Sequence, residues 1–235
     1  VLSKNVNLQL FIGKEVVATK KMDGTSFTAY KNSEGEFFVC SRSLTVKRGE
    51  NAYWNIAEKY NAEKFIAYFQ NFSNTYLSLD ELKHHIKKAA SVEDVVEVCF
   101  STRPDCISEK YLKEITEMIE QNNLDINFTL ELGLQSVNYH TLKKINRRHT
   151  LAEFIDAVLK AHKYDIKVGV HLILNLPGDD QDDVIENAKV LSALKVDNVK
   201  LHALYIRENT QFAELYEKGE LEIDSKEDYM ERVLT

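Results

Sequence analysis

Cysteine is scarce in this sequence, and long apolar runs are missing from it. The 235 residues include three cysteines, Cys40, Cys99 and Cys106, and no two of them are spaced as C-x-x-C. So few thiols, odd in number, argue against a disulfide framework and fit a reducing cytoplasm, where we expect the protein to be located. No apolar run is long enough to span a bilayer and no signal-peptide pattern opens the chain, so we expect no membrane partner.

A basic charge balance is also missing. Acidic residues outnumber basic residues by 37 to 30, and the formal net charge is −7. This balance argues against a protein that coats nucleic acid with its whole surface, although it allows a local basic groove. The sequence starts at Val1 without a methionine and stops at Thr235 within a helical pattern. We therefore expect both ends to be internal points of a longer protein.

Two sequence patterns meet near residue 61 without a proline- or glycine-rich linker between them. Before this point, short alternating apolar runs are separated by the turn signals Asp23-Gly24 and Asn32 to Gly35, a pattern typical of antiparallel hairpins. A short helix is predicted over residues 51–60.

After residue 61, apolar strands alternate with amphipathic helices. We therefore predict two parts, 1–61 and 62–235. The strands predicted in the second part are Phe65–Phe69, Val95–Phe100, Ile126–Leu132, Lys167–Leu174 and Asn198–Tyr205.

Strands that alternate with helices at this spacing predict parallel βαβ units and an α/β fold. Because each strand is almost continuously apolar, helices are expected to cover the outer face of either an open sheet or a partial barrel. Capping-box spacing, Ser78 with Glu81 and Thr150 with Glu153, predicts two helix starts. Gly219 predicts a helix end. The exposed edge of an incomplete barrel would need a partner, and residues 36–41 are a candidate strand for that edge.

The carboxyl ends of the predicted parallel strands carry polar residues, and these ends are where ligands bind in such folds. Glu131 and Gln135 share one face of the third strand by period-two alternation, and His171 lies in the fourth. Lys200 and His202 share one face of the fifth. A cavity lined by amides, a carboxylate and an imidazole suits a polar cofactor with a ribose and an amino-acid part.

Five segments in this order resemble a bacterial radical SAM family related to the elongator-protein and coproporphyrinogen-oxidase type. They are residues 67–76 (AYFQNFSNTY), 102–105 (TRPD), 131–136 (ELGLQS), 145–147 (INR) and 171–178 (HLILNLPG). The resemblance covers about residues 62–235 and implies a partial parallel (βα) barrel of about five βα units, preceded by a small antiparallel hairpin segment. It also implies S-adenosylmethionine at the barrel mouth, and a [4Fe–4S] cluster that reduces it to a 5′-deoxyadenosyl radical.

The polar strand ends and the resemblance together give a set of expected cofactor-binding residues. The set is Asn74, Thr75, Arg103, Glu131, Gln135, His171, Asn175, Pro177 and Gly178. By resemblance, Asn74 and Thr75 would lie near the methionine amino group, and Glu131 would face the ribose with its neighbour on the same strand. The turn that contains Asn175 would back the adenine, and Arg103 would lie in the cavity wall.

The sequence departs from this family at the cluster ligands. The family carries three cluster cysteines with C-x3-C-x2-C-like spacing after the first barrel strand, and other sequence stands in that place here. Without three thiolates the cluster has no site, so we expect no metal ligands and S-adenosylmethionine binding without turnover. Asn175 and Arg148 also stand where glycine is common in the family.

The first sixty residues favour a different chemistry. Lys21-Met22-Asp23-Gly24 fits the K-x-D-G pattern in which a lysine attacks the α-phosphate of ATP, although a solvated lysine in a hairpin turn explains it equally well. With its flanks at 11–16, 25–28 and 41–43, it resembles the start of an ATP-dependent RNA ligase adenylation domain. That resemblance implies ATP with Mg²⁺, adenylylation of Lys21, and contact of Arg42 with the nucleotide or the nucleic-acid end. The possible nucleic-acid partner is an RNA end or tRNA.

Three hypotheses about function therefore stand together. The first is a radical SAM-like protein that binds S-adenosylmethionine as a small-molecule cofactor. The second is a nucleotidyltransferase that acts through Lys21, although the later ligase motifs have no counterpart after Tyr60. The third is a chimeric chain without a complete activity, suggested by the repeat of residues 57–60 (AEKY) in 62–65 (AEKF).

Overall fold

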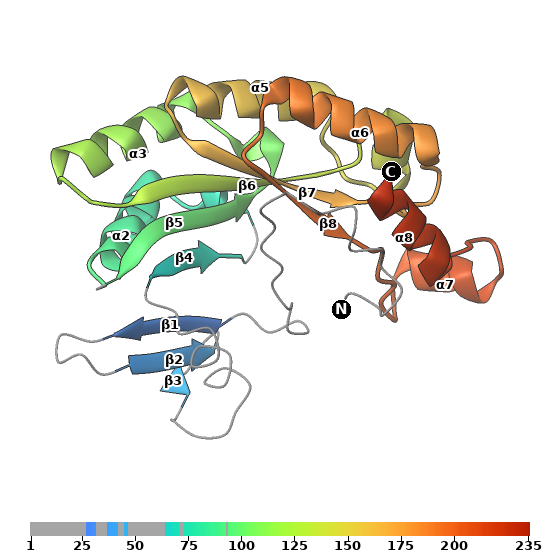
Figure 1. Ribbon diagram of the computed structural model, residues 1–235, viewed down its shortest axis with the longest axis horizontal. Helices are drawn as coiled ribbons and strands as arrows, with labels where there is room; N and C mark the ends of the chain where they lie inside the picture. The colour runs from blue at the N-terminus through green and yellow to red at the C-terminus, as the bar shows by residue number, and fades with distance from the viewer. Residues whose placement is uncertain (1–26, 32–36, 42–44, 47–63, 71–72, 93) are drawn as a thin grey trace, which may run out of the picture.

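The structure is a computed structural model that describes residues 27–31, 37–41, 45–46, 64–70, 73–92 and 94–235 (Figure 1). These residues form two sheets, a small antiparallel sheet and a larger parallel one. The helix predicted over residues 51–60 lies outside the described residues, as do Lys21 and Arg42. None of the described helices combines the length and the apolar character needed to cross a membrane.

The small sheet contains three strands, β1 (Phe27–Lys31), β2 (Phe37–Ser41) and β3 (Thr45–Val46). β1 and β2 pair antiparallel, with Lys31 opposite Phe37, so the hairpin predicted across residues 32–35 is confirmed. β2 lies between β1 and β3, and both of its sides are therefore used within this sheet. The prediction that residues 36–41 pair with the edge of the barrel is wrong for this reason.

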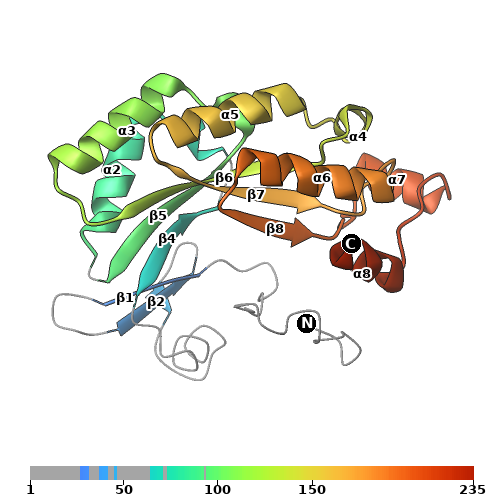
Figure 2. The ribbon, with the colours of Figure 1, turned by 45° about the horizontal axis from the view of Figure 1, so that its top comes forward.

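The larger sheet contains five parallel strands in the order in which they occur in the chain. They are β4 (Phe65–Phe69), β5 (Val95–Thr102), β6 (Asn127–Gln135), β7 (Lys167–Ile173) and β8 (Asn198–His202). The strands twist and curl into a half-barrel (Figures 1 and 2). The predicted partial parallel barrel of five units, with a hairpin segment before it, is confirmed.

Helices connect the strands and continue the chain after the last one. The α-helices are α2 (Leu79–Ala90), α3 (Glu109–Gln121), α4 (Tyr139–Lys144), α5 (Leu151–Lys163), α6 (Gln181–Leu194), α7 (Gln211–Glu217) and α8 (Lys226–Leu234). Two single-turn 3₁₀ helices, η2 (Asn74–Tyr76) and η3 (Pro104–Cys106), follow β4 and β5. Both predicted capping boxes form, at Ser78 and Thr150. Gly219, with a φ of +71°, follows the end of α7 as predicted.

One hydrophobic core lies between the sheet and four of these helices, α2, α3, α5 and α6. Strand residues such as Val98, Phe100 and Leu130 are fully buried in it. Phe100 makes edge-to-face contacts with Phe69 and Phe128, at ring-centroid distances of 4.6 and 5.6 Å. Since all four helices pack on the same face, the strand residues that alternate with these apolar ones belong to the opposite face. We call the helix-covered face of the larger sheet the outer face, and the opposite one the inner face.

The helix cover is incomplete at the last strand. Val199 and Leu201 of β8 are each 42% exposed. They pair with core residues of β7 and therefore belong to the outer face. The expectation that helices cover the outer face of every strand therefore holds for the first four strands and fails at β8.

Candidate functional site

Strand register brings polar side chains from all five strands onto the inner face. Tyr68 of β4 pairs with Cys99 of β5, and Ser101 pairs with Glu131 of β6. His171 of β7 pairs with Lys200 of β8. Residues paired across a sheet, and residues two apart within a strand, share a face. The inner face of the half-barrel is therefore polar, whereas the outer face is apolar.

Glu131 lies at the centre of this polar face and is almost completely buried, with a side chain that is 5% exposed. His171 Nε2 lies 2.8 Å from its Oε2 atom, and the Lys200 ammonium donates to its Oε1 atom. Burial alone would raise the pKa of Glu131, but hydrogen bonds from His171, Lys200 and Tyr68 outweigh that effect and lower the pKa to about 2. Glu131 is therefore a buried carboxylate that stays ionised at neutral pH.

The hydrogen-bond network continues from Glu131 to the last strand. His171 Nδ1 lies 2.8 Å from His202 Nε2. The ionised Glu131 accepts a hydrogen bond from His171 Nε2–H, and the other nitrogen of the His171 ring is hydrogen-bonded to the His202 ring. The Lys200 ammonium also lies 4.6 Å from the centroid of the Tyr68 ring, within the range of a cation–π contact. One network thus joins four strands of the sheet.

Asn74 and Thr75, predicted near the methionine amino group, join the loop after β4 to the end of β5. The Asn74 Nδ2 group donates to the carbonyl oxygens of Phe69 and Ser101, at 2.6 and 2.7 Å. The hydroxyls of Thr75 and Thr102 are 2.6 Å apart. Both residues are buried at the carboxyl end of the strands. The structure places them at the mouth of the half-barrel, and their contact with a cofactor stays a prediction.

Arg147 is a half-buried cation at the mouth that the sequence-based site set does not include. Its Nε and Nη2 atoms donate to the Gly133 carbonyl at 3.2 and 2.8 Å, and its Nε atom lies 2.9 Å from His149 Nε2. No carboxylate of the described residues forms an ion pair with Arg147. Burial, and then the positive charge of Arg103, lower its pKa. Arg147 is therefore a cation that lacks an anionic partner within the described chain.

Arg103, the arginine of the predicted set, has an acidic partner. Arg103 forms a two-point ion pair with Asp105, at 2.9 Å from Nε and 2.8 Å from Nη2.

Gln135, the predicted ribose neighbour of Glu131, has a φ of +75° and lies where the β6–β7 register shifts. A Cβ atom at Gly133 would come within 2.5 Å of Arg147 Nη2 and 2.7 Å of Gln135 Nε2. The ends of these two flexible side chains therefore converge at Gly133, and both would have to move to make room for a larger residue there.

The loop after β7 contains the residues predicted to back the adenine, and it is fixed at several points. The Asn175 Oδ1 atom accepts from the Leu204 amide at 2.6 Å, which joins this loop to the segment after β8. Arg232 of α8 donates to the carbonyl oxygens of Leu174 and Asp179, at 3.1 and 3.0 Å. Gly178, next to Pro177, has a φ of +108°, a conformation that favours glycine. The loop is therefore held close to the mouth in one conformation.

The cysteines of this chain do not fit a [4Fe–4S] cluster, which needs thiolates. Cys99 lies in the middle of β5 and Cys106 lies in η3, and burial raises the pKa of both thiols. The side chain of Cys40 is not described. Within the described residues, no three histidine, cysteine or acidic side chains are grouped as metal ligands. No step through a cluster is therefore derived for this chain.

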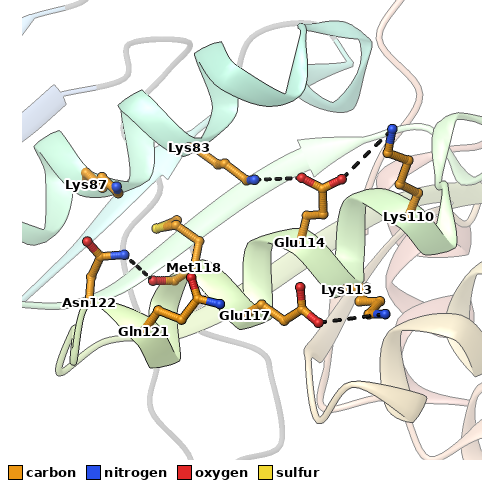
Figure 3. Close-up of a pocket in the computed structure, with 9 residues that line it drawn as sticks. All are labelled: Lys83, Lys87, Lys110, Lys113, Glu114, Glu117, Met118, Gln121 and Asn122. Carbon is orange, nitrogen blue, oxygen red and sulfur yellow. Dashed lines mark hydrogen bonds and ion pairs between the residues drawn. The ribbon is translucent and has the colours of Figure 1, made fainter.

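A separate hollow of about 510 Å³ lies on the helix layer, between α2 and α3 (Figure 3). Charged side chains line most of it, including Lys83, Lys87, Lys110, Lys113, Glu114 and Glu117. Lys83 and Glu114 are 2.7 Å apart, and Lys113 pairs with Glu117 at 3.7 Å. Four lysines against two glutamates leave the hollow with a net positive charge, and its lining comes from α2, α3 and the residue after α3, with none from the strand ends. The inner face is therefore the stronger candidate site.

Sequence reasoning brought part of this site together and missed part of it. Period-two alternation placed Glu131 with Gln135 and placed Lys200 with His202, but the site set left out both residues of β8. Tyr68 shared the same alternation signal in the first strand. Arg147 had no such signal, because it lies in a turn between Asn146 and Arg148, which both have a positive φ. Arg148 has a φ of +62°, a backbone conformation that favours glycine.

Comparison with known proteins identifies relatives of this chain. A family model described as the Radical SAM superfamily matches residues 31–191. The chain is 36% identical to the uncharacterized protein YtqA of Bacillus subtilis, over 75% of this chain and 53% of that protein. It is 34% identical to the uncharacterized protein MJ0486 of Methanocaldococcus jannaschii, over 91% of this chain and 66% of that protein. The tRNA uridine(34) acetyltransferase of the same archaeon is 29% identical over 58% of this chain and 24% of its own length.

Solved structures share the fold at lower sequence identity. Elp3 from Methanocaldococcus infernus with an N-terminal deletion has a TM-score of 0.63 and 21% identity, over 77% of this chain and 47% of that one. Coproporphyrinogen III oxidase (HemN) from Escherichia coli, described as a radical SAM enzyme, has a TM-score of 0.54 and 16% identity, over 72% and 38%. The chain spans 53 to 66% of the length of the first two curated relatives. These matches give no support to the ligase-like segment or to its ATP and Mg²⁺.

Proposed function

The chain belongs to the radical SAM superfamily, and on that premise we propose that the inner face of its half-barrel binds S-adenosylmethionine. The observation that carries the proposal is the buried, ionised Glu131. Burying a carboxylate costs several kcal/mol of desolvation free energy, and the outer face alone provides the hydrophobic core. A charge kept in such a place, at the mouth of a parallel sheet, marks a ligand-binding position.

The ribose, the carboxylate and the adenine of the ligand each have a matching group at the mouth. Hydroxyl groups of a ribose are hydrogen-bond donors, and the Glu131 carboxylate and the Gln135 amide are the acceptors on β6. The ligand carboxylate needs a cation, and Arg147 is the half-buried cation that lacks an anionic partner among the described side chains. Asn175, Pro177 and Gly178 would lie against the adenine. When bound in this superfamily, S-adenosylmethionine supplies a 5′-deoxyadenosyl radical after reduction by a cluster.

The test is a titration of S-adenosylmethionine into the 235-residue chain at neutral pH. We expect one binding site, weakened at least about tenfold by Glu131→Gln and by Arg147→Met, because each change removes one charge-assisted hydrogen bond. Lys113→Met on α3 is the matched control and should leave the affinity unchanged. Absence of binding at millimolar ligand, or equal effects of all three variants, would contradict the proposal.

We also propose that this chain alone binds the ligand without cleaving it. The reason is that its three cysteines lack the C-x3-C-x2-C spacing, and that no three metal-ligating side chains are grouped within the described residues. The chain should be incubated anaerobically with iron, sulfide and dithionite, and the solution analysed for 5′-deoxyadenosine. None is expected above the protein-free control. Formation of this product in proportion to the protein concentration would overturn the idea.

A second proposal concerns an RNA substrate at the rim of the same mouth. Residues 138–150 contain four cations and no carboxylate, although the whole chain has a net charge of −7. Lys143, Lys144 and Arg148 of this segment are exposed. Exposed lysines and arginines that are concentrated on one surface supply the phosphate contacts of RNA-binding proteins. The relative named as a tRNA uridine(34) acetyltransferase acts on such a substrate, which supports this proposal.

Fluorescence anisotropy with an unmodified tRNA transcript tests the RNA proposal. The double variant Lys143→Ala, Lys144→Ala should weaken binding about tenfold, and the slope of log K against log salt concentration should fall by about two. The control is the double variant Lys110→Ala, Lys113→Ala on α3, which removes the same charge from the helix layer. If both double variants lose equal affinity, or if the transcript does not bind at low salt, RNA recognition at the rim is ruled out.

A further inference from the structure

Lys200 places a positive charge beside Glu131, the carboxylate at the centre of the proposed ligand site. Its ammonium group donates to Glu131 and lies 4.6 Å from the centre of the Tyr68 ring. A carboxylate beside an aromatic face is a favourable environment for a cation, and Lys200 occupies this environment from within the chain. The ion pair also cancels the negative charge of Glu131.

From this contact we infer that Lys200 is a specificity-determining residue. Its positive charge lowers the affinity of the inner face for a cationic ligand relative to an uncharged ligand of the same shape. The inference rests on the proposed binding of S-adenosylmethionine. The sulfonium group of that ligand is joined to its ribose through one methylene carbon. A ribose hydroxyl that is hydrogen-bonded to Glu131 therefore brings the sulfonium to roughly 10 Å or less from the Lys200 ammonium, which contacts the same carboxylate.

The partners of Glu131 differ in how easily they move. A carboxylate accepts about four hydrogen bonds, and His171, Lys200 and Tyr68 already provide three. The His171 side chain is 16% exposed and is held by His202. The Lys200 side chain is 44% exposed and has a flexible stem. Lys200 is therefore the partner that yields when ligand hydroxyls bind, although its charge stays nearby.

The two positive charges repel each other wherever the ammonium moves within this pocket. Two like charges about 10 Å apart at an effective dielectric constant of about 20 change an affinity by more than tenfold, and solvent at the half-exposed lysine reduces this to about tenfold. S-adenosylhomocysteine differs from S-adenosylmethionine by one methyl group and one positive charge. The ratio of the two dissociation constants therefore isolates the effect of charge from the effect of shape.

The experiment measures both dissociation constants by calorimetry for the 235-residue chain and for Lys200→Met. The measured quantity is the dissociation constant of S-adenosylhomocysteine divided by that of S-adenosylmethionine. Removal of the ammonium in Lys200→Met should raise this ratio about tenfold. Lys200→Arg, which keeps the charge, should leave the ratio within about twofold of the original. Lys113→Met should also leave the ratio unchanged, since its Glu117 pair lies on the helix layer. Far-ultraviolet circular dichroism and thermal melting establish that each variant is folded.

The possible results separate this inference from the proposed function. If the unchanged chain binds neither ligand at millimolar concentration, both the proposed function and the role of Lys200 are wrong. If both ligands bind and Lys200→Met changes the two constants by the same factor, Lys200 has a structural role and the specificity inference alone is overturned. A ratio that rises in Lys200→Met and is kept in Lys200→Arg supports it. Should Lys200→Met not fold, Lys200→Gln replaces it with the same expected ratio.

Discussion

The two faces of the larger sheet differ in what they contribute, although the same strands form both. In β5, the fully buried Val98 and Phe100 of the outer face alternate with Cys99 and Ser101 of the inner face. In β6, the buried Leu130 precedes Glu131. The outer face is apolar and packed under helices, whereas the inner face carries a charged hydrogen-bond network. The apolar core and the polar network, which we propose to be the ligand site, are thus formed by alternate residues of one sheet.

The difference has an energetic reason. Burial of apolar side chains on the outer face contributes about 25 cal/mol for each Å² removed from water. On the inner face, the desolvation of Glu131 opposes folding and is offset by hydrogen bonds from three other side chains. An apolar side chain of similar size would fill the same place without that cost. The retained charge therefore points to binding rather than to stability.

The largest expected effect is on the outer face. Phe100→Ala should lower the free energy of unfolding by about 3–5 kcal/mol, because it leaves a cavity between Phe69 and Phe128. Urea unfolding followed by circular dichroism measures the change. Binding of S-adenosylmethionine to the folded fraction should be retained, and Phe100→Leu should lose much less stability. Loss of affinity in a folded Phe100→Ala protein would break the division between the two faces.

The second effect is a pH-dependent loss of stability at the inner face. The pKa of Glu131 is lowered to about 2, from an ordinary value of 4.5, so its ionised form favours the folded state. This contribution, roughly 2–3 kcal/mol, is fully present above pH 4.5 and disappears as the pH falls toward 2. Glu131→Gln should therefore be destabilising at pH 7, and the difference from the unchanged chain should close on acidification. Urea unfolding at pH 7, 5 and 3 measures it.

The matched control for acidification is an exposed carboxylate on the helix layer, Glu186. Its pair with Lys189 is long, at 3.7 Å, and both side chains are largely exposed. Glu186→Gln should leave stability almost unchanged over the same pH range. A pH-independent difference for Glu131→Gln would mean that Glu131 acts through its shape and not through its charge.

The smallest expected effect tests the helix layer alone. Ser78→Ala removes the side-chain acceptor of the α2 capping box and should cost about 1 kcal/mol of stability. Thr150→Ala at the start of α5 should cost a similar amount for the same reason. Thermal melting measures both changes. Neither change should alter the affinity for S-adenosylmethionine, so a weakened ligand affinity in a folded cap variant would show that the helix layer participates in binding.

Local pattern was sufficient to predict the strands, the capping boxes and the polar parity of the inner face. All five predicted strands are present, because a short apolar run between two helical segments is typical of a buried parallel strand. The partners of Glu131 could not be predicted from the sequence. Contacts between different strands depend on the strand register, and no local pattern determines that register. Arg147 was missed because its position depends on a turn with left-handed backbone. The exposure of Val199 was missed because helix cover is a tertiary property.

Hydrogen–deuterium exchange with and without saturating S-adenosylmethionine tests the central claim, binding at the inner face, most directly. The amides of residues 73–77, 135–138 and 174–179, in the loops after β4, β6 and β7, should exchange more slowly with ligand present. The amides of α2 and α3, which line the separate hollow, should be unaffected (Figure 3). Protection confined to α2 and α3, or no protection at all, would contradict the claim.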